Sequence, residues 1–204
     1  MRQLVLLFLM GSACFYSWGQ NQKELKKEVK AFQKDLRKQY RSKEDSPLRT
    51  KAERREFKGH KFYKYDPEWV VNASYEVISS PDTIVMPTSA GTTKKFLKYA
   101  KIAFVKDSVS CVFYGYRNVK YINHEEYGRY LFIPFTDATS GTETYGGGRY
   151  LDIEMPSSNT ITINFNLAYN PYCAYATGWF CPIPPRDNDL KVSVRAGIRG
   201  PETH

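Results

Sequence analysis

The residue types best suited to chemistry in this chain gather in the stretch DATSGTETYGGGRYLDIE, residues 137–154. Three consecutive glycines at 146–148 let the backbone adopt positive φ values or approach another group closely. Successive N–H groups in such a turn can bind an anion, and Arg149 follows them directly. The carboxylates of Asp137 and Glu143 can orient a ligand. This pattern predicts a small pocket for a polar or anionic ligand.

A second interpretation of the same stretch is purely structural. Asp, Thr and Ser side chains commonly accept hydrogen bonds from nearby backbone N–H groups in turns. The residue types leave both interpretations open. If the loop binds a ligand, we expect Arg149 to supply charge and Glu143 and Asp137 to orient the ligand. Tyr145 and Tyr169 would then form aromatic walls.

The stretch NFNLAYNPYCAYATGWFCPIPPRDN, residues 164–188, is the second candidate. Its Tyr and Trp residues indicate an aromatic wall, and its Asn side chains can form hydrogen bonds. We expect Cys173 and Cys181 to form a disulfide in an exported chain, with two reduced, packed thiols as the alternative. Cys111, inside an apolar run, is expected to be a buried free thiol. The candidate ligand-binding residues are Asp137, Ser140, Glu143, Tyr145, Arg149, Asn166, Tyr169 and Asn170.

Several kinds of site are not predicted. The three His residues have no spacing to other ligands that indicates zinc, so we expect no metal. The phosphate-loop, dinucleotide-binding and nucleophile-elbow motifs are absent, so we expect no cofactor. A metal-independent hydrolase or lyase in the same pocket remains an alternative. It would use Glu143 as general acid or base, with a pKa raised by burial.

The net charge of +9 belongs to the N-terminal part of the chain. Residues 1–60 carry 15 Lys and Arg against 7 Asp and Glu, whereas the following 144 residues carry 15 against 14. A nucleic-acid-binding domain more often concentrates positive charge on its binding face. We therefore expect no nucleic-acid partner.

The first residues, MRQLVLLFLMGSACFYSWGQ, have the pattern of a secretory signal peptide over residues 1–19. Small residues at Ser17 and Gly19 favour cleavage before Gln20. A partial lipobox ending at Cys14 is the alternative, and it would anchor the chain through a lipid. Either way we expect an exported protein, periplasmic or secreted, with lipid anchoring as the less favoured form.

The elements that must position the candidate residues are mostly strands. Residues 22–41 carry an apolar stripe at helical spacing and predict an amphipathic helix. The acidic residues Glu24, Glu28 and Asp35 interrupt its basic face, which favours docking on the body over binding to a membrane. A short helix is expected over 46–58, with Ser46 as N-cap.

Alternating patterns and turns predict strands from residue 70 onward, including one over 190–197. The turn KDS, residues 106–108, is expected to join two of these strands in a hairpin. Pro134, in the apolar run 129–135, indicates a bulge or an edge strand. These elements indicate a mainly β (α+β) protein, an antiparallel β-sandwich or small barrel with an N-terminal helical arm. The expected divisions are a signal peptide (1–19), a basic helical arm (20–58), a β-rich domain (59–199) and a tail (200–204).

Two long motifs in order, FIPFTDATSGTETYGGGRYLDIE and NFNLAYNPYCAYATGWFCPIPPRDNDLKVSVRAGIR, closely resemble the prokaryotic family labelled domain of unknown function 1684. The segment from SPL at residue 46 to the EW at 69 resembles the family's upstream part, and the resemblance spans residues 24–199. It implies no activity or cofactor. It does imply that both candidate stretches belong to the family's hallmark.

The first hypothesis is thus an exported protein that binds a small polar or anionic ligand between the 137–150 loop and the 164–181 segment. The hydrolase or lyase is the second hypothesis. The third is a structural or interaction protein of the cell envelope, whose basic helix docks on a partner. The oligomeric state is not indicated by the sequence.

Overall fold

The computed structural model describes residues 10–202, with side chains from residue 21 onward. Most of the apolar run of the predicted signal peptide, and the side chain of the lipid-anchor candidate Cys14, lie outside the described residues. In the described part, no helix is both long and apolar enough to span a membrane.

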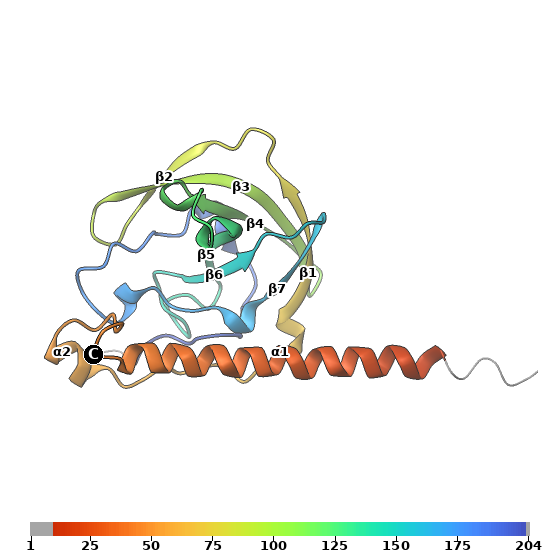
Figure 1. The fold of residues 1–204 in the computed structure, drawn as a ribbon, viewed down its shortest axis with the longest axis horizontal. Helices are drawn as coiled ribbons and strands as arrows, with labels where there is room; N and C mark the ends of the chain where they lie inside the picture. The colour runs from red at the N-terminus through yellow and green to blue at the C-terminus, as the bar shows by residue number, and fades with distance from the viewer. Residues whose placement is uncertain (1–9, 203–204) are drawn as a thin grey trace, which may run out of the picture.

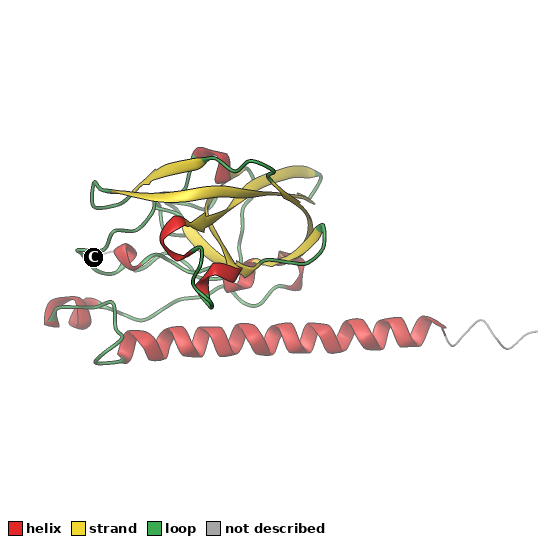
Figure 2. Cartoon of the chain, turned by 45° about the horizontal axis from the view of Figure 1, so that its top comes forward, coloured by secondary structure: helices red, strands yellow, loops and turns green. Residues whose placement is uncertain are grey.

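Helix α1 (Met10–Arg41) confirms the predicted amphipathic helix and begins earlier than expected. It lies along one side of the β body, and its N-terminal turns project past the sheet (Figures 1 and 2). Val29 and Tyr40 are buried against the body, and Phe32 and Leu36 are partly buried, as the apolar stripe requires.

Helix α2 (Lys51–Glu56) is shorter than the expected helix over 46–58, and the predicted N-cap Ser46 is wrong. Thr50 is the N-cap instead, and it forms a reciprocal capping box with Glu53. The Ser46 hydroxyl accepts from the Leu48 N–H and donates to the Tyr40 carbonyl. These two hydrogen bonds fix the turn that follows α1. In this turn Leu48 is buried against Tyr40.

One curled antiparallel sheet forms the body, in the order β6-β5-β4-β3-β1-β7, with β2 added beside β3 and a short parallel β8 beside β5 (Figure 1). The mainly β fold with an N-terminal helical arm is confirmed, and the sheet is closer to the barrel than to the sandwich alternative. Its strands are β1 (Val70–Val77), β2 (Thr83–Pro87), β3 (Thr93–Lys106), β4 (Val109–Asn118), β5 (Tyr130–Asp137), β6 (Arg149–Glu154), β7 (Thr160–Asn164) and β8 (Asp189–Leu190).

The β3–β4 hairpin confirms the predicted turn at KDS. Asp107 and Ser108 have φ values of 49° and 66°, as a two-residue hairpin turn requires. Farther from this turn, the pairing register of β3 with β4 shifts between Lys98 and Ala100. Such a bulge changes the face of the sheet on which alternate side chains lie. Phe96 therefore lies on the outer face of the sheet, whereas Ile102 of the same strand points into the main core.

The main core fills the concave side of the sheet with residues from every long strand. A smaller cluster of Met86, Phe96 and Tyr116 lies on the other face of β2–β4, with Phe132 packed against it. Figure 2 shows the sheet curling over this interior, with α1 as a separate layer beneath. The smaller cluster leads directly into a cavity of about 980 Å³.

The expected strand over 190–197 is wrong beyond Leu190, where β8 ends. The segment does bury alternate residues, as the sequence pattern indicated: Val192, Val194, Ala196 and Ile198 are buried. Beyond Leu190, the described part of the chain forms β pairing only through an isolated bridge between Ile198 and Phe62. The carbonyls of Val194, Ala196 and Ile198 accept hydrogen bonds from Arg149, so a side chain takes the place of a neighbouring strand there.

Candidate functional site

Arg149 has no exposed surface, although the sequence hypothesis assigned its charge to a ligand. Its guanidinium donates to the carbonyls of Val194, Ala196 and Ile198, at 2.8, 2.6 and 3.1 Å. It also donates to Asp137 Oδ2 at 2.8 Å, in an ion pair whose two side chains are both fully buried. The expectation that Arg149 offers charge to a ligand is therefore corrected, because solvent cannot reach it.

Asp137 completes this buried latch. Its Oδ1 accepts from the Thr139 N–H at 2.8 Å, from the Thr139 hydroxyl at 2.6 Å and from the Val194 N–H at 3.2 Å. The Ser140 hydroxyl accepts from the Asp137 N–H at 3.1 Å. These bonds match the second interpretation of the stretch, in which its side chains hold its own backbone. Asp137 is buried and fully used by these bonds, whereas Ser140 is partly exposed and its role as a ligand-binding candidate stays a prediction.

The glycine triplet has a steric role at Gly148. Its φ is +83°, and a Cβ there would lie 2.6 Å from the Phe135 carbonyl oxygen and 2.6 Å from Pro184 Cγ. Gly146 has no such restriction, since its nearest contact would be 3.5 Å away. The sequence predicted that the glycine backbone approaches another group closely. It does so at Gly148, and the neighbouring group belongs to the protein itself.

Glu143 and Tyr145 line a separate cavity of about 440 Å³, away from Tyr169. Arg195 binds the Glu143 carboxylate in bidentate fashion, at 2.7 to 3.1 Å, and the Tyr63 hydroxyl donates to it at 3.0 Å. The Arg195 hydrogen bonds lower the pKa of Glu143. A general acid or base at neutral pH needs the opposite shift, so the lowered pKa counts against this role of Glu143, which stays a prediction.

Asn166 and Asn170 are buried and bind the protein's own groups. The Asn166 amide accepts from the Asp66 N–H at 2.9 Å and donates to the Asp66 carbonyl at 2.8 Å. Asn170 donates to the Tyr175 hydroxyl at 2.8 Å and to the Arg199 carbonyl at 2.9 Å. Both side chains join distant segments of the chain, and among the described residues Asn170 Oδ1 has no hydrogen-bond partner.

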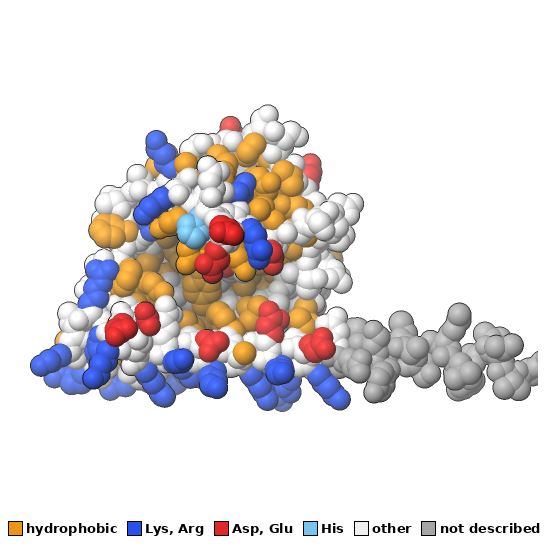
Figure 3. Space-filling model, in the orientation of Figure 1, with side chains coloured by type: hydrophobic (Ala, Val, Ile, Leu, Met, Phe, Trp, Pro, Cys, Tyr) orange, Lys and Arg blue, Asp and Glu red, His pale blue; other side chains and the backbone are white. Residues whose placement is uncertain are grey.

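A larger cavity of about 980 Å³ lies on the face of the sheet opposite the main core. Figure 3 shows a hollow lined by hydrophobic side chains between the β body and α1. Strands β3 to β6, the segment 119–130 and the segment 169–182 contribute its walls. Of the sequence candidates, Tyr169 and Cys181 line this cavity.

One wall is a continuous row of aromatic rings. Phe96 stacks on Phe132 with ring centroids 5.4 Å apart, and Phe132 meets Tyr150 edge-on at 4.8 Å. Tyr150 in turn meets Tyr169 edge-on at 5.8 Å. The row continues to Phe32 of α1 at 6.4 Å. Because each ring is fixed by the next, the wall is preformed rather than assembled around a ligand.

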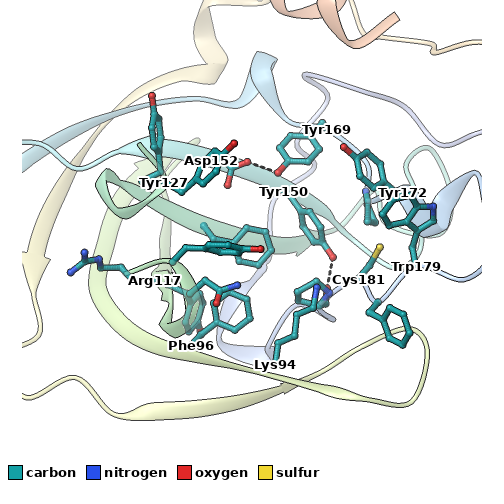
Figure 4. A pocket seen from close by; sticks show the side chains of 18 of the residues that line it. Lys94, Phe96, Arg117, Tyr127, Tyr150, Asp152, Tyr169, Tyr172, Trp179 and Cys181 are labelled. Atoms are coloured by element: carbon teal, nitrogen blue, oxygen red, sulfur yellow. Dashed lines mark hydrogen bonds between the residues drawn. The ribbon is translucent and has the colours of Figure 1, made fainter. Parts of the chain in front are cut away.

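Asp152 and Tyr169 form the polar centre of this cavity (Figure 4). The Tyr169 hydroxyl donates a short hydrogen bond to Asp152 Oδ2. Asp152 is exposed to solvent within the cavity, and crowding by the surrounding protein atoms raises its pKa. Burial likewise raises the pKa of Tyr169, with Asp152 as the next cause. A carboxylate in such surroundings favours a hydrogen-bond donor or a cation as its partner.

The opposite wall comes from the segment after Tyr169. Tyr172 and Trp179 meet edge-on at 4.7 Å, and the Arg49 guanidinium lies 4.0 Å from the Trp179 ring centre. Arg117 also faces the cavity, and it donates to the carbonyls of Ile122 and Gly128. These contacts orient both guanidinium groups and leave their charges in place, and Lys94 is a third cation of the lining.

Cys173 and Cys181 are adjacent free thiols, and the predicted disulfide is not formed. The Cys173 N–H points at Cys181 Sγ, 3.4 Å away, and the Tyr145 hydroxyl lies 3.9 Å from Cys173 Sγ. The hydrogen bond from the Cys181 thiol lowers the pKa of Cys173 to about 6. Cys111 is buried and free, as expected.

Sequence reasoning missed Asp152 as a central residue and did not predict the roles of Tyr150, Phe132 and Phe96. A signal existed for the first two. Tyr150 and Asp152 alternate with the core residue Leu151 on β6, and period-two alternation places them together on the outer face. Phe96 had no such signal, because the bulge in β3 decides its face.

The comparisons with known proteins give a relative without an assigned role. The chain is similar to an uncharacterised protein from gene locus rrnAC0354 of Haloarcula marismortui, whose structure was solved by solution NMR. The two are 31% identical, with a TM-score of 0.69, and the match covers 88% of this chain and 96% of that one. No curated protein matches the sequence. The profile of the family described as "Protein of unknown function (DUF1684)" matches residues 55–199, and the chain belongs to that family.

Proposed function

We propose that the protein binds a small molecule in the aromatic cavity, through a flat apolar body and one hydrogen-bond donor. The observation that supports this proposal is the Asp152–Tyr169 pair, which faces a preformed aromatic cavity of about 980 Å³. Cavities of this size, largely apolar with few placed polar groups, are the usual form of small-molecule sites.

The chemistry of the lining defines the ligand class. Rings along both walls favour a flat apolar or cationic group. The Tyr169 hydroxyl donates its proton to Asp152. The carboxylate can accept further hydrogen bonds, so it can bind a donor group on the ligand. The ligand is therefore an aromatic or alicyclic amine or alcohol. This replaces the anionic ligand expected from the 137–150 loop, whose Arg149 is buried.

The experiment is a thermal-shift screen with aromatic amines, phenols and alicyclic alcohols, with aromatic carboxylates as the opposing set. A ligand at about 100 times its Kd should raise the stability by roughly 2.7 kcal/mol. Hits are then titrated with Asp152→Asn and Tyr169→Phe, and with Glu154→Gln as the control. Glu154 lies two residues from Asp152 on the same strand, with an exposed side chain paired to Arg129.

We expect Asp152→Asn to weaken amine or alcohol binding about tenfold or more, since a hydrogen bond to a charged group is lost. Its melting temperature should not fall, because the surroundings of Asp152 in the folded protein already disfavour its charged form. Glu154→Gln should bind as the wild type does. Equal affinity in all variants, or hits confined to carboxylates, would contradict the proposal.

A hydrolase or lyase remains the second candidate, and its acid–base group moves from Glu143 to Asp152. The observation in its favour is the raised pKa of Asp152 beside a hydroxyl donor in a cavity. Each bound ligand should be incubated with the protein and followed by mass spectrometry. Turnover that rises with pH through the Asp152 pKa, and disappears in Asp152→Asn, would favour an enzyme over a binding protein.

We also propose that the chain is exported and that Cys173 and Cys181 close a disulfide there. The export signals in the sequence and the position of Cys181 Sγ, 3.4 Å from the Cys173 backbone nitrogen, support this. Intact mass of the chain from the host envelope tests both points. A chain starting at Gln20 and two hydrogens lighter than the dithiol agrees, whereas a full-length dithiol chain in the cytoplasm contradicts the proposal.

A further inference from the structure

Helix α1 has three sides of different character. Successive residues rotate by about 100° around a helix axis, so their side chains can be placed around it. The side with Val29, Leu36 and Tyr40 packs on the body. The acidic residues that seemed in the sequence to interrupt the basic face, such as Glu28 and Asp35, lie on one flank. The cations lie on the other flank.

We call this second surface the basic flank. It covers about 120° of the helix surface, and the acidic residues do not interrupt it. Figure 3 shows Lys and Arg side chains along the lower edge of the coloured part of α1, with acidic side chains above them. The basic flank consists of Lys23, Lys26, Lys27, Lys30, Lys34, Arg37, Lys38 and Arg41, all exposed.

The charges of the basic flank are not neutralised by the protein. Among the described residues, none of the ion pairs includes a cation of α1. Arg37 lies 4.8 Å from the ring centre of Phe62, which leaves its charge in place. The rest of the chain is nearly neutral, so this one surface carries most of the net charge of +9. A row of exposed cations on a rigid helix suits an extended anionic partner.

We propose that the basic flank docks the protein on an anionic phospholipid bilayer, with α1 parallel to the surface. The apolar side of α1 is already buried in the body, so the contact is electrostatic rather than insertion. The apolar run Leu4–Met10 of the proposed export signal brings the chain to a membrane before residues 1–19 are removed. An exported chain meets lipid headgroups rather than nucleic acid. The inference does not depend on the cavity.

The test uses the full chain and sedimented vesicles of phosphatidylcholine, with and without phosphatidylglycerol. One variant combines Lys27→Glu, Lys30→Glu and Lys34→Glu. The control makes the same charge change at exposed lysines of the body, with Lys95→Glu, Lys101→Glu and Lys120→Glu. Both variants keep the apolar N-terminal residues, so their difference measures the basic flank. Melting temperatures establish that both are folded.

We expect phosphatidylglycerol to tighten binding by at least about tenfold, and added salt to reverse this gain. The flank variant should lose the gain, and the body variant should keep most of it. Equal binding to neutral and anionic vesicles, or equal binding by the two variants, would overturn the proposal. So would a DNA duplex that binds the flank more tightly than the anionic vesicles do at the same salt concentration.

Discussion

The buried latch of Arg149 and Asp137 predicts a large loss of stability in Arg149→Met. The variant keeps the length of the apolar stem and removes all four hydrogen bonds of the guanidinium. Leaving the Asp137 carboxylate buried without its partner costs about 3–5 kcal/mol. The three carbonyls of the 194–198 segment also lose their donor, each at a further cost of about 1–3 kcal/mol where water cannot replace it.

We therefore expect Arg149→Met to lose about 5 kcal/mol or more, a large part of the stability of a typical domain. For a chain of this size, that loss lowers the melting temperature by roughly 10–20 °C. Urea unfolding, followed by circular dichroism, gives the free energy directly. If the variant does not fold at all, Asp137→Asn measures the same pair with less disruption, because its amide oxygen can still accept from Thr139.

Arg195→Met is the matched control, since Arg195 also pairs with an acidic residue of the same loop, Glu143. Its side chain is 60% exposed, whereas that of Arg149 is fully buried. An exposed pair contributes little because water solvates both charges when the pair is broken. We expect Arg195→Met to unfold close to the wild type. If the two variants were equally stable, the assignment of Arg149 as a structural latch would be refuted.

Three further predictions concern buried or strained positions. Burial lowers the pKa of His60 to about 4, so this side chain takes up a proton more readily in the unfolded chain than in the folded protein. As the pH falls from 7 to 5, this difference should remove about 2 kcal/mol of stability. The stability of His60→Phe should lack most of this pH dependence, and an unchanged pH profile would contradict the role given to His60. Asn188→Leu leaves the backbone N–H and carbonyl of Tyr114 and the carbonyl of Pro134 without a hydrogen-bond partner. The substitution should lower the free energy of unfolding in urea by about 3 kcal/mol, whereas a neutral substitution at the surface should leave it unchanged. Gly148→Ala should lower the melting temperature markedly while Gly146→Ala should not, and equal melting would argue against the steric role of Gly148.

The structural role of Asn188 explains an irregularity that the sequence only suggested. Pro134 has no N–H to donate, and β4 pairs with β5 at a single position, Tyr116 with Phe132. The Asn188 side chain fills the gap, with hydrogen bonds to both backbone groups of Tyr114 and to the Pro134 carbonyl. The proline thus marks an interrupted ladder, and only the folded chain shows which distant residue completes it.

Local patterns predicted most of the secondary structure, because helix and strand periodicity depend on residues close in sequence. The stripe of α1, the strands β1 to β7 and the KDS turn follow from spacing and turn chemistry. The segment 190–197 shows the limit of such reasoning. Its alternation reports burial correctly, but whether alternating residues form a strand depends on which partner accepts the backbone hydrogen bonds.

The candidate site depended on tertiary structure. The sequence by itself determined that the 137–150 loop carries unusual polar chemistry, that the helical arm carries the basic charge, and that aromatic residues follow residue 164. It did not determine which of these groups meet solvent. Arg149 and Asp137 are buried by a segment 45 residues or more away in sequence, whereas Asp152 faces a cavity. Burial is a property of the packed chain, and it decides whether a charged side chain stabilises the fold or binds a ligand.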